Sequence, residues 1–455
     1  MNTLGQARLF STQEHSPVAY TVTGEVFPAE FRRRVDGITR HLLQHPEQRW
    51  ALVCDDTLWF AAGFLALTNA RKTVILPQAS GPSNVAEAQA AAVLTDQPAR
   101  FASFIRLDVA AASGSDTYTE AGLDDSLSVE LYTSGSTGRP KRVDKQLRQL
   151  RAEVMALEAQ WGQQLGDAVV LASVPHHHLY GLLFRVLWPL WTGRPFYAAS
   201  CMQMSEFNAA ARRFERCFIV SSPAFLTRVT DFGLLQPKNA FVALFSSGAP
   251  LPETTAAKIA TELGHATIEV YGSTETGGIA WRSWEPASGQ TPWQAFTDVE
   301  TTAPEIIPGL LRVRSPWTWR AAWVDSGDLA QALPQNRFRL CGRADSVLKV
   351  EDKRISLAEM EQRLAAHELV SAARLLLLEG NRTSVGAVVV LNNAGRRQVE
   401  RTGTPDVRKA LMEMLRDWYD PVLVPRKWRF VEALPGNDMG KIEHEKLQAL
   451  FMERP

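Results

Sequence analysis

The sequence has few cysteines, no excess of either charge sign and no long apolar run. Its four cysteines, Cys54, Cys201, Cys217 and Cys341, are scattered with no C-x-x-C or other paired spacing. This pattern argues against a disulfide framework and against a zinc module. The 49 basic residues balance 49 acidic ones. That balance disfavours a general nucleic-acid binder, which needs a basic surplus to neutralise phosphates.

No apolar stretch reaches the roughly 18 residues of a membrane span. The most apolar segment, GLLFRVLWPLWTG, is interrupted by Arg185 and Pro189. The N-terminal residues show no basic region followed by an apolar core, so we expect no secretory signal. The sequence therefore predicts a cytoplasmic protein without membrane insertion.

The 455 residues, 45% of them apolar, suffice for two or three domains of about 150 residues each. Short apolar runs alternate with Ala- and Leu-rich segments of helical character. We predict strands at 52–54, 73–76, 168–173, 217–221, 240–245 and 267–271, and a helix at 59–70. This alternation favours an α/β fold whose stacked, mixed or parallel sheets are covered by helices. Segments rich in Pro and Trp before residue 343 indicate a smaller antiparallel subdomain.

The pattern of predicted secondary-structure elements changes near residue 343. Ser356 and Glu359 form a capping-box pattern that opens a helix at 356–367. Thr404, Pro405 and Asp406 open a second helix. Its predicted apolar face comprises Val407, Leu411, Met414 and Trp418. We therefore predict a large N-terminal domain at 1–343 and a small α+β C-terminal domain at 344–455.

The most informative segment is a run of hydroxyl and glycine residues that a lysine closes. It reads Tyr132-Thr133-Ser134-Gly135-Ser136-Thr137-Gly138-Arg139-Pro140-Lys141. Glycines let backbone N–H groups turn toward one anion, and the hydroxyls and the lysine add further donors. The segment thus predicts a polyphosphate cradle. It is not a Walker A loop, because the second glycine of that pattern would fall on Pro140.

At this segment the sequence resembles the adenylate-forming superfamily of acyl- and aryl-CoA synthetases, luciferases and peptide-synthetase adenylation domains. The family's other motifs follow in order. They are Ser247-Gly248-Ala249-Pro250-Leu251, Val270-Tyr271-Gly272-Ser273-Thr274-Glu275, Trp323-Val324-Asp325-Ser326-Gly327-Asp328-Leu329, Cys341-Gly342-Arg343-Ala344-Asp345, and Leu434-Pro435 with Gly440-Lys441-Ile442. The resemblance spans about residues 50–450. It implies a barrel-like subdomain and a mobile C-terminal domain that turns about Asp345.

The resemblance also implies roles for individual residues. The implied catalytic residues are Lys441, Thr274, Glu275 and His178. The implied nucleotide-binding residues are Thr133, Ser134, Gly135, Ser136, Thr137, Gly138, Lys141, Gly248, Ala249, Pro250, Tyr271, Gly272, Asp328 and Arg343. Glu275 and Thr137 are the implied Mg²⁺ ligands.

The chemistry of the residues agrees with this assignment. A carboxylate that attacks the α-phosphorus of ATP brings two anions together, so the site must supply positive charge. Mg²⁺, the loop with Thr137 and Lys141, and Lys441 supply it. The products are an acyl-adenylate and pyrophosphate. A second half-reaction transfers the acyl group to a thiol after the C-terminal domain rotates.

The segment Pro175-His176-His177-His178-Leu179-Tyr180-Gly181 resembles the family's P-x-x-H-x-x-G, which places His178 between the acid pocket and the thiol tunnel. Adjacent residues of a strand alternate faces, so these histidines are poorly suited to one metal ion. No nearby aspartate is present for an ammonium group, which disfavours a free α-amino acid. Tyr180 either flanks an aromatic substrate or packs in the core. The predicted acid pocket, for an aryl or simple acyl acid, comprises His178, Tyr180, Ser246, Ser247, Gly248 and Gly272.

The predicted thiol tunnel comprises Lys349, Asp352 and Arg354, with Asp352 in place of the family's glycine. Compact chains of this kind resemble ligases that load acyl carrier proteins in aryl polyene and xanthomonadin pathways. Segment 396–429 holds nine basic residues against five acidic ones. The nine are Arg396, Arg397, Arg401, Arg408, Lys409, Arg416, Arg426, Lys427 and Arg429. Such a patch suits an acidic partner.

We therefore expect an ATP- and Mg²⁺-dependent ligase that loads a small carboxylic acid onto the phosphopantetheine thiol of an acidic acyl carrier protein. Two alternatives stay open. The first is a CoA synthetase that uses free CoA as the acceptor. The second is a protein that binds nucleotide or acyl-adenylate without turnover.

Overall fold

The structure is a computed structural model that describes residues 16–112, 124–133, 140–201, 203–232, 241–284, 291–344, 347–350, 353–378, 384–416, 419, 423–435 and 444–452. Contacts divide the chain into two units. The first comprises Met1–Glu300 with Arg314–Val324, and the second comprises Thr301–Val313 with Asp325–Pro455. The predicted division between residues 343 and 344 stays a prediction.

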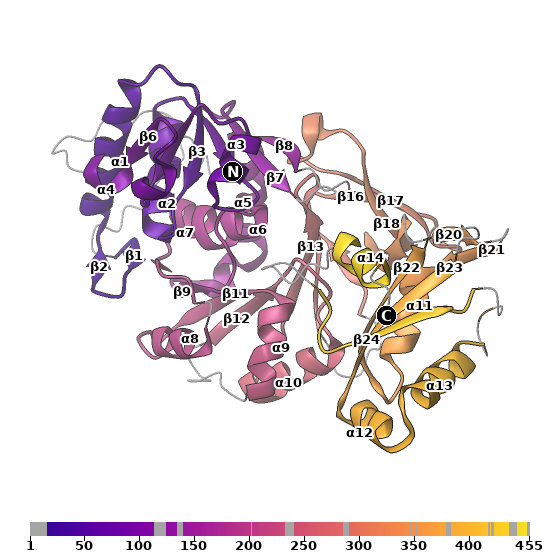
Figure 1. The fold of residues 1–455 in the computed structure, drawn as a ribbon. Helices are drawn as coiled ribbons and strands as arrows, with labels where there is room; N and C mark the ends of the chain where they lie inside the picture. The colour runs from indigo at the N-terminus through magenta and orange to yellow at the C-terminus, as the bar shows by residue number, and fades with distance from the viewer. Residues whose placement is uncertain are drawn as a thin grey trace. The chain divides into compact units, whose positions relative to one another are not determined.

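A six-stranded sheet forms one half of the first unit, with strand order β6-β5-β3-β4-β7-β8. The strands are β3 (Arg49–Val53), β4 (Thr73–Leu76), β5 (Ala92–Thr95), β6 (Arg106–Asp108), β7 (Ser128–Thr133) and β8 (Lys141–Gln146). Neighbours from β6 to β7 are parallel, and β8 pairs antiparallel with β7. The associated helices are α1 (Pro28–Leu43), α2 (Thr57–Asn69), α3 (Pro82–Glu87) and α4 (Val109–Ala112), as Figure 1 shows.

Helix α2 confirms the helix predicted at 59–70. It begins where the Asp56 carboxylate accepts hydrogen bonds from the N–H groups of Leu58 and Trp59, which otherwise lack partners at a helix start. Eleven of its thirteen residues are buried. This helix is apolar all round because it lies inside the unit rather than on its surface.

The second sheet of the first unit has the strand order β15-β14-β13-β12-β11-β9-β10-β1-β2. These strands are β1 (Ala19–Tyr20), β2 (Glu25–Val26), β9 (Val169–Ala172), β10 (Phe196–Tyr197), β11 (Cys217–Ser221), β12 (Phe241–Ser246), β13 (Ile268–Ser273), β14 (Gly277–Ser283) and β15 (Trp293–Ala295). From β1 to β13 the neighbours are parallel, and β14 and β15 are antiparallel. The predicted parallel strands are therefore confirmed.

Further helices accompany this sheet. They are α5 (Leu147–Leu165), α6 (Leu179–Gly181), the π-helix η2 (Leu182–Leu187), α7 (Trp188–Thr192), α8 (Met204–Ala211), α9 (Pro223–Phe232) and α10 (Glu253–Leu263). Trp161 of α5 packs against Phe245 of β12 and Trp281 of β14, with ring centroids 5.0 and 5.8 Å apart. Aromatic contacts of this kind anchor α5 to the sheet.

The second unit contains β17 (Gly309–Arg314), β18 (Val324–Leu333) and β19 (Arg337–Arg343), with β18 and β19 antiparallel. It also contains a hairpin of β20 (Val347–Val350) and β21 (Lys353–Ser356), and a sheet of order β22-β23-β24. The strands of that sheet are β22 (Val370–Leu378), β23 (Ser384–Leu391) and β24 (Lys427–Val431). The helices are α11 (Leu357–Ala365), α12 (Asn393–Thr402), α13 (Thr404–Arg416) and α14 (His444–Met452).

The predicted apolar face of α13 needs one correction. Val407, Leu411 and Leu415 are the buried residues of this helix, because positions four apart lie on one face. Met414 packs beside them and is only partly buried, while Trp418 lies outside the described residues. The α/β class predicted from the sequence is confirmed. Within the described parts of the chain, no helix combines the length and apolarity that a membrane crossing needs.

Candidate active site

The carboxyl ends of three parallel strands bring hydroxyl groups to one edge of the second sheet. Strands β11, β12 and β13 end at Ser221, Ser246 and Ser273, and Ser221 pairs in register with Ser246. The Ser247 hydroxyl donates to the Val270 carbonyl at 2.8 Å. The Ser246 Oγ atom is buried and has no hydrogen-bond partner among the residues that the structure describes. This edge is the position at which open α/β sheets bind ligands.

Tyr180 and His178 lie on the segment that precedes the π-helix η2. Gly181 permits the tight approach of this segment, since a Cβ atom there would lie 1.9 Å from the Pro175 carbonyl oxygen. The Tyr180 ring packs on Phe184 with centroids 4.7 Å apart. Burial raises the pKa of the Tyr180 phenol well above its ordinary value, so the group is a neutral hydroxyl. Phe184 thus packs against the Tyr180 ring, and a contact of Tyr180 with an aromatic acid stays a prediction.

The neighbouring histidines are committed to protein contacts. His176 Nε2 lies 2.8 Å from the Cys54 carbonyl, and its Nδ1 lies 3.1 Å from the Thr57 hydroxyl. A carbonyl only accepts, so Nε2 carries the proton and Nδ1 accepts from Thr57. Burial lowers the pKa of His176 well below its usual value. These contacts give both ring nitrogens of His176 a partner within the protein.

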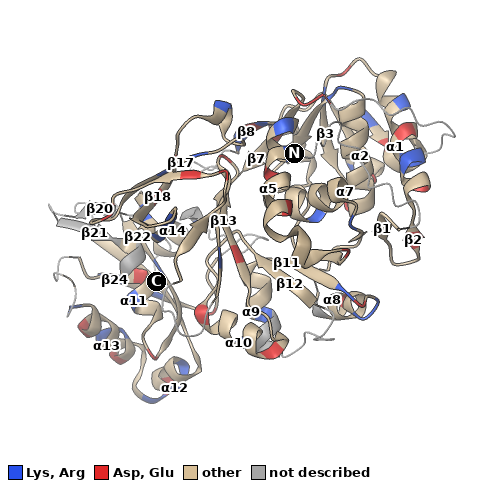
Figure 2. Cartoon of the chain, turned by 180° about the vertical axis from the view of Figure 1, so that it is seen from behind, with Lys and Arg blue, Asp and Glu red and all other residues tan. Residues whose placement is uncertain are grey.

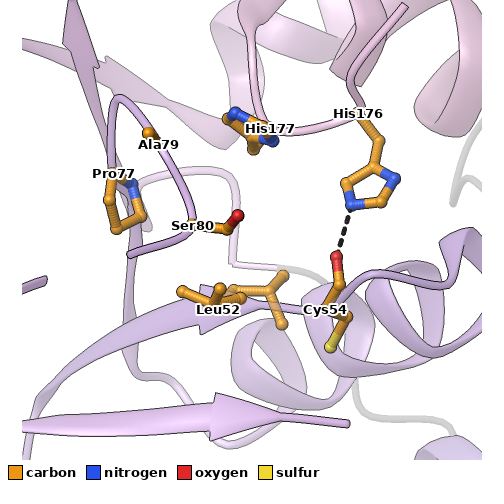
Figure 3. A pocket seen from close by; sticks show the side chains of 8 residues that line it. Leu52, Cys54, Pro77, Ala79, Ser80, His176 and His177 are labelled. Atoms are coloured by element: carbon orange, nitrogen blue, oxygen red, sulfur yellow. Dashed lines mark hydrogen bonds between the residues drawn. The ribbon is translucent and has the colours of Figure 1, made fainter. Parts of the chain in front are cut away.

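Figure 3 shows a small hollow beside these histidines, at the carboxyl ends of β3 and β4. Its empty space, open to solvent, is about 210 Å³. The lining residues are Leu52, Val53, Cys54, Pro77, Ala79, Ser80, His176 and His177. Burial, together with the charge of His178, lowers the pKa of His177 to about 3, so this ring is neutral at physiological pH.

One ion pair of the candidate site joins two predicted motifs. Lys141 Nζ lies 2.7 Å from the Glu275 carboxylate oxygen Oε1. Lys141 begins β8, and Glu275 lies in the turn between β13 and β14. Burial disfavours the charged form of Glu275, but the hydrogen bond from Lys141 and further hydrogen bonds outweigh it and lower the pKa. The carboxyl group is therefore ionised.

The turn that carries Thr274 and Glu275 is held by its own hydroxyls. The Ser273 N–H donates to Thr276 Oγ1 at 3.1 Å, and the Thr276 N–H donates to Ser273 Oγ at 3.2 Å. Gly272 is required beside it, because a Cβ atom there would lie 2.2 Å from the Gly277 carbonyl oxygen. Thr274 is half-exposed. The reciprocal hydroxyl contacts fix the turn from which Thr274 and Glu275 project.

The base of the predicted phosphate loop is described, and its tip is not. Thr133 of β7 and Lys141 of β8 are register partners, and the Thr133 hydroxyl donates to the Lys141 carbonyl at 3.4 Å. The predicted loop residues Ser134, Gly135, Ser136, Thr137 and Gly138 lie outside the described residues.

Two further predicted nucleotide contacts lie together in the second unit. Arg343 Nη1 is 3.6 Å from Asp328 Oδ1, and the two residues are register partners on β19 and β18. Gly327 has a φ of +79°, and a Cβ atom there would approach Arg343 Nη2 to 3.0 Å. The glycine therefore leaves room for the arginine beside the aspartate.

The remaining nucleotide-binding candidates of the first unit lie near the strand ends. Gly248 has a φ of +96°, a backbone conformation that glycine adopts readily. Ala249 and Pro250 follow it and are exposed. The Tyr271 ring packs against Trp293 with centroids 5.4 Å apart.

Glu275 of the first unit has the chemistry that Mg²⁺ with phosphates requires, and Asp328 of the second unit, taken by itself, has the chemistry that a ribose requires. Mg²⁺ binds proteins through one or two carboxylates together with phosphate oxygens and waters, and the ionised Glu275 is a carboxylate of this kind. Among the residues that the structure covers, no cluster of three or more His, Cys, Asp or Glu could hold a metal ion. The carboxylate of Asp328 is an acceptor suited to ribose hydroxyls.

Comparison with known proteins identifies the fold and the family. The profile of the family described as AMP-binding enzyme matches residues 29–301. The chain belongs to the AMP-binding enzyme family. This membership confirms the resemblance to adenylate-forming enzymes that the motifs indicated.

Relatives of this AMP-binding enzyme carry names of acid–CoA ligases. The mitochondrial malonate–CoA ligase ACSF3 of Mus musculus is 26% identical over 398 residues, which cover 72% of this chain and 65% of the mouse protein. The 4-coumarate–CoA ligase of Halorhodospira halophila is 27% identical over 322 residues, covering 68% of this chain and 74% of that protein. The chain thus spans slightly less than two thirds of the malonate–CoA ligase.

Solved structures share the fold. ATP-bound MatB from Rhodopseudomonas palustris superposes with a TM-score of 0.83 at 19% identity, covering 98% of each chain. The o-succinylbenzoate CoA synthetase MenE from Bacillus subtilis, in complex with AMP, superposes with a TM-score of 0.79 at 17% identity, covering 95% of each chain. These structures establish that this member of the family has the adenylate-forming fold.

Several predicted positions of the enzyme cannot be placed. Asp345, Asp352 and Lys441 lie outside the described residues. Lys349 and Arg354, predicted for the thiol tunnel, are register partners on β20 and β21.

The basic segment of the enzyme maps to α12, α13 and β24, and Figure 2 shows Lys and Arg on α12 and α13. The residues exposed on the two helices are Arg396, Arg397, Arg401, Arg408, Lys409 and Arg416. Arg429 is different, because its Nε donates to the Leu450 carbonyl at 2.8 Å within the unit. Arg429 therefore contributes to packing as well as to the charge of the segment.

The sequence reasoning missed three polar residues beneath the turn of Glu275. Lys145, Gln149 and Glu153 are all buried, although residues of these types usually face solvent. Gln149 and Glu153 lie four apart on α5, on the face that also carries buried Leu150 and Val154. Their interleaving with these apolar positions was the signal that could have revealed their burial.

Proposed function

We propose that this chain is an AMP-forming acid–CoA ligase. In the first half-reaction the carboxylate of a small acid attacks the α-phosphorus of ATP, forms the acyl-adenylate and releases pyrophosphate. In the second half-reaction the CoA thiol attacks the acyl carbon, forms the thioester and releases AMP. Membership of the AMP-binding enzyme family supports the first half-reaction, and the names of the relatives support the second.

The observation that carries the proposal is the 2.7 Å contact between Lys141 and Glu275. Two motifs 134 residues apart in the sequence place an ammonium group and a carboxylate side by side. The ammonium group suits phosphate oxygens, and the carboxylate suits a divalent cation bound to those phosphates. A metal–nucleotide complex can therefore interact with both groups, through its phosphates and through its metal.

The roles of the residues follow from their chemistry. When bound, Mg²⁺ neutralises phosphate charge and polarises the phosphoryl group under attack. Lys141 donates to phosphate oxygens, and the Thr274 hydroxyl donates to the α-phosphate or the acid. Asp328 accepts hydrogen bonds from the ribose hydroxyls, with Arg343 beside it. Lys441 is proposed to donate to the bridging oxygen as charge develops there.

CoA is the proposed acceptor, in place of the carrier protein that the sequence favoured. The relatives are named as CoA ligases, and the comparisons offer no support for a carrier protein. The pathway type inferred from the compact chain likewise lacks support. Docking of an acidic carrier protein on segment 396–429 stays a hypothesis, which charge reversal at Arg396, Arg397 and Arg401 tests by comparing transfer to CoA and to a holo-carrier protein.

Two classes of acid are candidates. The names of several relatives favour malonate. The candidate acid pocket favours a neutral tail, because Tyr180 and Ser246 present buried hydroxyls. A second carboxylate would need a cationic partner in so buried a place. An aryl acid, such as the coumarate named for other relatives, fits the hydroxyls better.

The domain motion and the location of the enzyme also remain proposals. We propose a large domain at 1–343 and a small domain at 344–455 that turns about Asp345 between the half-reactions. Lys349, Asp352 and Arg354 are proposed to line the path of the thiol. We propose a cytoplasmic location.

A screen of acid-dependent pyrophosphate release tests the function. The acids are malonate, 4-coumarate, benzoate and a short fatty acid, each with CoA and, separately, with a holo-carrier protein. We expect release with at least one acid, and thioester formation with CoA. Absence of acid-dependent release across a broad panel, with ATP binding retained, would favour the non-catalytic alternative.

A further inference from the structure

Beneath the turn of Glu275 lies a buried ammonium group that is bonded to backbone carbonyls. Lys145 Nζ donates to the Glu275 carbonyl at 3.1 Å and to the Trp317 carbonyl at 2.9 Å. The lysine is only 2% exposed. Burying a charge is costly unless hydrogen bonds compensate it. The two carbonyls compensate part of this cost, so the burial of Lys145 depends on its hydrogen bonds to Glu275 and Trp317.

Two lysines of strand β8 contact Glu275. Lys141 and Lys145 are four residues apart on the strand, so their side chains leave the same face about 13 Å apart. Lys141 reaches the carboxylate of Glu275, whereas Lys145 reaches its carbonyl oxygen. One strand thus holds both the side chain and the backbone of the proposed metal ligand.

Helix α5 completes this buried set. Gln149 Nε2 donates to the Trp317 and Thr318 carbonyls at 3.2 and 3.0 Å. Glu153 Oε1 accepts a hydrogen bond of 2.6 Å from the Gly278 N–H. Gln149 thereby holds the Trp317 backbone that Lys145 also contacts, and Glu153 holds the start of β14 just after the turn.

The packing around the turn leaves little freedom for other arrangements. Gly277 has a φ of +69°, and a Cβ atom there would lie 2.4 Å from the Trp317 ring and 2.7 Å from Glu153 Oε2. The Trp317 indole N–H donates to the Gly278 carbonyl at 3.0 Å. The turn is therefore clamped between Trp317 and α5, and Lys145 is the group that bridges Trp317 to Glu275.

We propose that Lys145 is a positioning residue for the binding of Mg²⁺ with ATP, because it fixes the backbone of Glu275 relative to strand β8 and the Trp317 backbone. The inference rests on the proposed function, in which Glu275 binds the metal. It assigns to Lys145 no contact with substrate. Partners that orient a metal ligand typically change metal affinity by about 10- to 100-fold when they are removed.

The test compares two lysine variants of the full-length protein. Lys145→Met removes the donor and keeps an apolar stem of similar length. Lys72→Met is the matched control, since Lys72 is 4% exposed and lies just before β4 of the same six-stranded sheet, where it donates to the His45 carbonyl at 2.7 Å rather than to the turn of Glu275. ATP binding is measured by calorimetry as a function of Mg²⁺ concentration, beside thermal unfolding of each variant.

We expect Lys145→Met to raise the Mg²⁺ concentration needed for half-maximal ATP binding by about tenfold. Lys72→Met should leave that concentration unchanged while it lowers the unfolding temperature. If Lys145→Met does not fold, Lys145→Gln replaces it, with an expected shift in the same direction that is smaller, because glutamine keeps a neutral donor. A folded Lys145 variant with the Mg²⁺ dependence of the wild type would overturn the inference.

The measurement separates this inference from the proposed function. A wild-type protein that binds ATP with Mg²⁺ but activates no acid refutes the ligase proposal, while a shifted Mg²⁺ dependence in Lys145→Met still supports positioning. Wild-type ATP binding that does not depend on Mg²⁺ refutes the metal role of Glu275 and, with it, the positioning role of Lys145.

Discussion

Replacing Glu275 by glutamine separates the contribution of its charge to folding from its contribution to function. The Lys141–Glu275 pair is 2.7 Å long, and its side chains are 59% and 36% exposed. Exposed pairs of this kind contribute only about 0–1 kcal/mol to stability. Glutamine keeps the shape and one oxygen acceptor. The unfolding temperature of Glu275→Gln should therefore change by no more than a few degrees.

The effect on activity should be much larger. The charge stabilisation that a bound metal supplies at a phosphoryl group is several kcal/mol, and each 1.36 kcal/mol is a factor of ten in rate. We expect acid-dependent pyrophosphate release to fall by at least about 100-fold at a fixed Mg²⁺ concentration, and higher Mg²⁺ should recover only part of it.

A matched control removes a similar surface charge elsewhere. The pair of Arg151 and Asp125 is 2.9 Å long, with exposures of 32% and 45%, and Asp125→Asn should leave both stability and activity close to those of the wild type. Pyrophosphate release is followed with a coupled assay, and unfolding is followed by circular dichroism. The reasoning fails if Glu275→Gln retains more than half of the activity, or if it loses activity only because it unfolds.

Three further predictions follow from single positions. Lys441→Ala should abolish acid-dependent exchange of labelled pyrophosphate into ATP and leave the circular dichroism spectrum unchanged; retained exchange would remove its assigned role. Gly272→Ala should lower the free energy of unfolding by about 1–3 kcal/mol, because its Cβ would overlap the Gly277 carbonyl. Gly24 has open space around it, so Gly24→Ala should leave that free energy unchanged. Urea unfolding measures both. Burial lowers the pKa of His177 to about 3, below about 6.5 in the unfolded chain. Stability should therefore fall as the pH drops from about 6.5 toward about 3. His177→Gln should reduce that fall, as urea midpoints measured at each pH will show.

The sequence was sufficient for the motifs whose residues cannot be explained by packing. A run of hydroxyl and glycine residues ending in Lys141 cannot pack a core. Its occurrence in one sequence with the Glu275 motif predicted that the two motifs belong to one site. The structure brings these two residues into contact. Parallel strands were predictable for a similar reason, because runs such as Thr73–Leu76 are apolar on both faces.

Other features required the tertiary structure. Lys145, Gln149 and Glu153 resemble ordinary surface residues, and their burial depends on contacts with Trp317 and Gly278, which are more than 120 residues away. The motifs also could not identify the thiol that accepts the acyl group. The charge of segment 396–429 suits an acidic partner as well as ordinary solvation, so it could not decide between a carrier protein and CoA.

The contact between Lys141 and Glu275 has a consequence for how nucleotide is recruited. Before nucleotide arrives, the two groups form an internal zwitterion, so this part of the site presents little net charge to an approaching polyanion. In the proposed function, binding would be an exchange of partners, in which Lys141 would contact phosphate in place of the carboxylate and Glu275 would hold a metal in place of the ammonium group. Long-range attraction contributes little to such an exchange, because the field of two opposite charges 2.7 Å apart decays quickly with distance. The association rate of metal–nucleotide at this locus should therefore respond weakly to ionic strength.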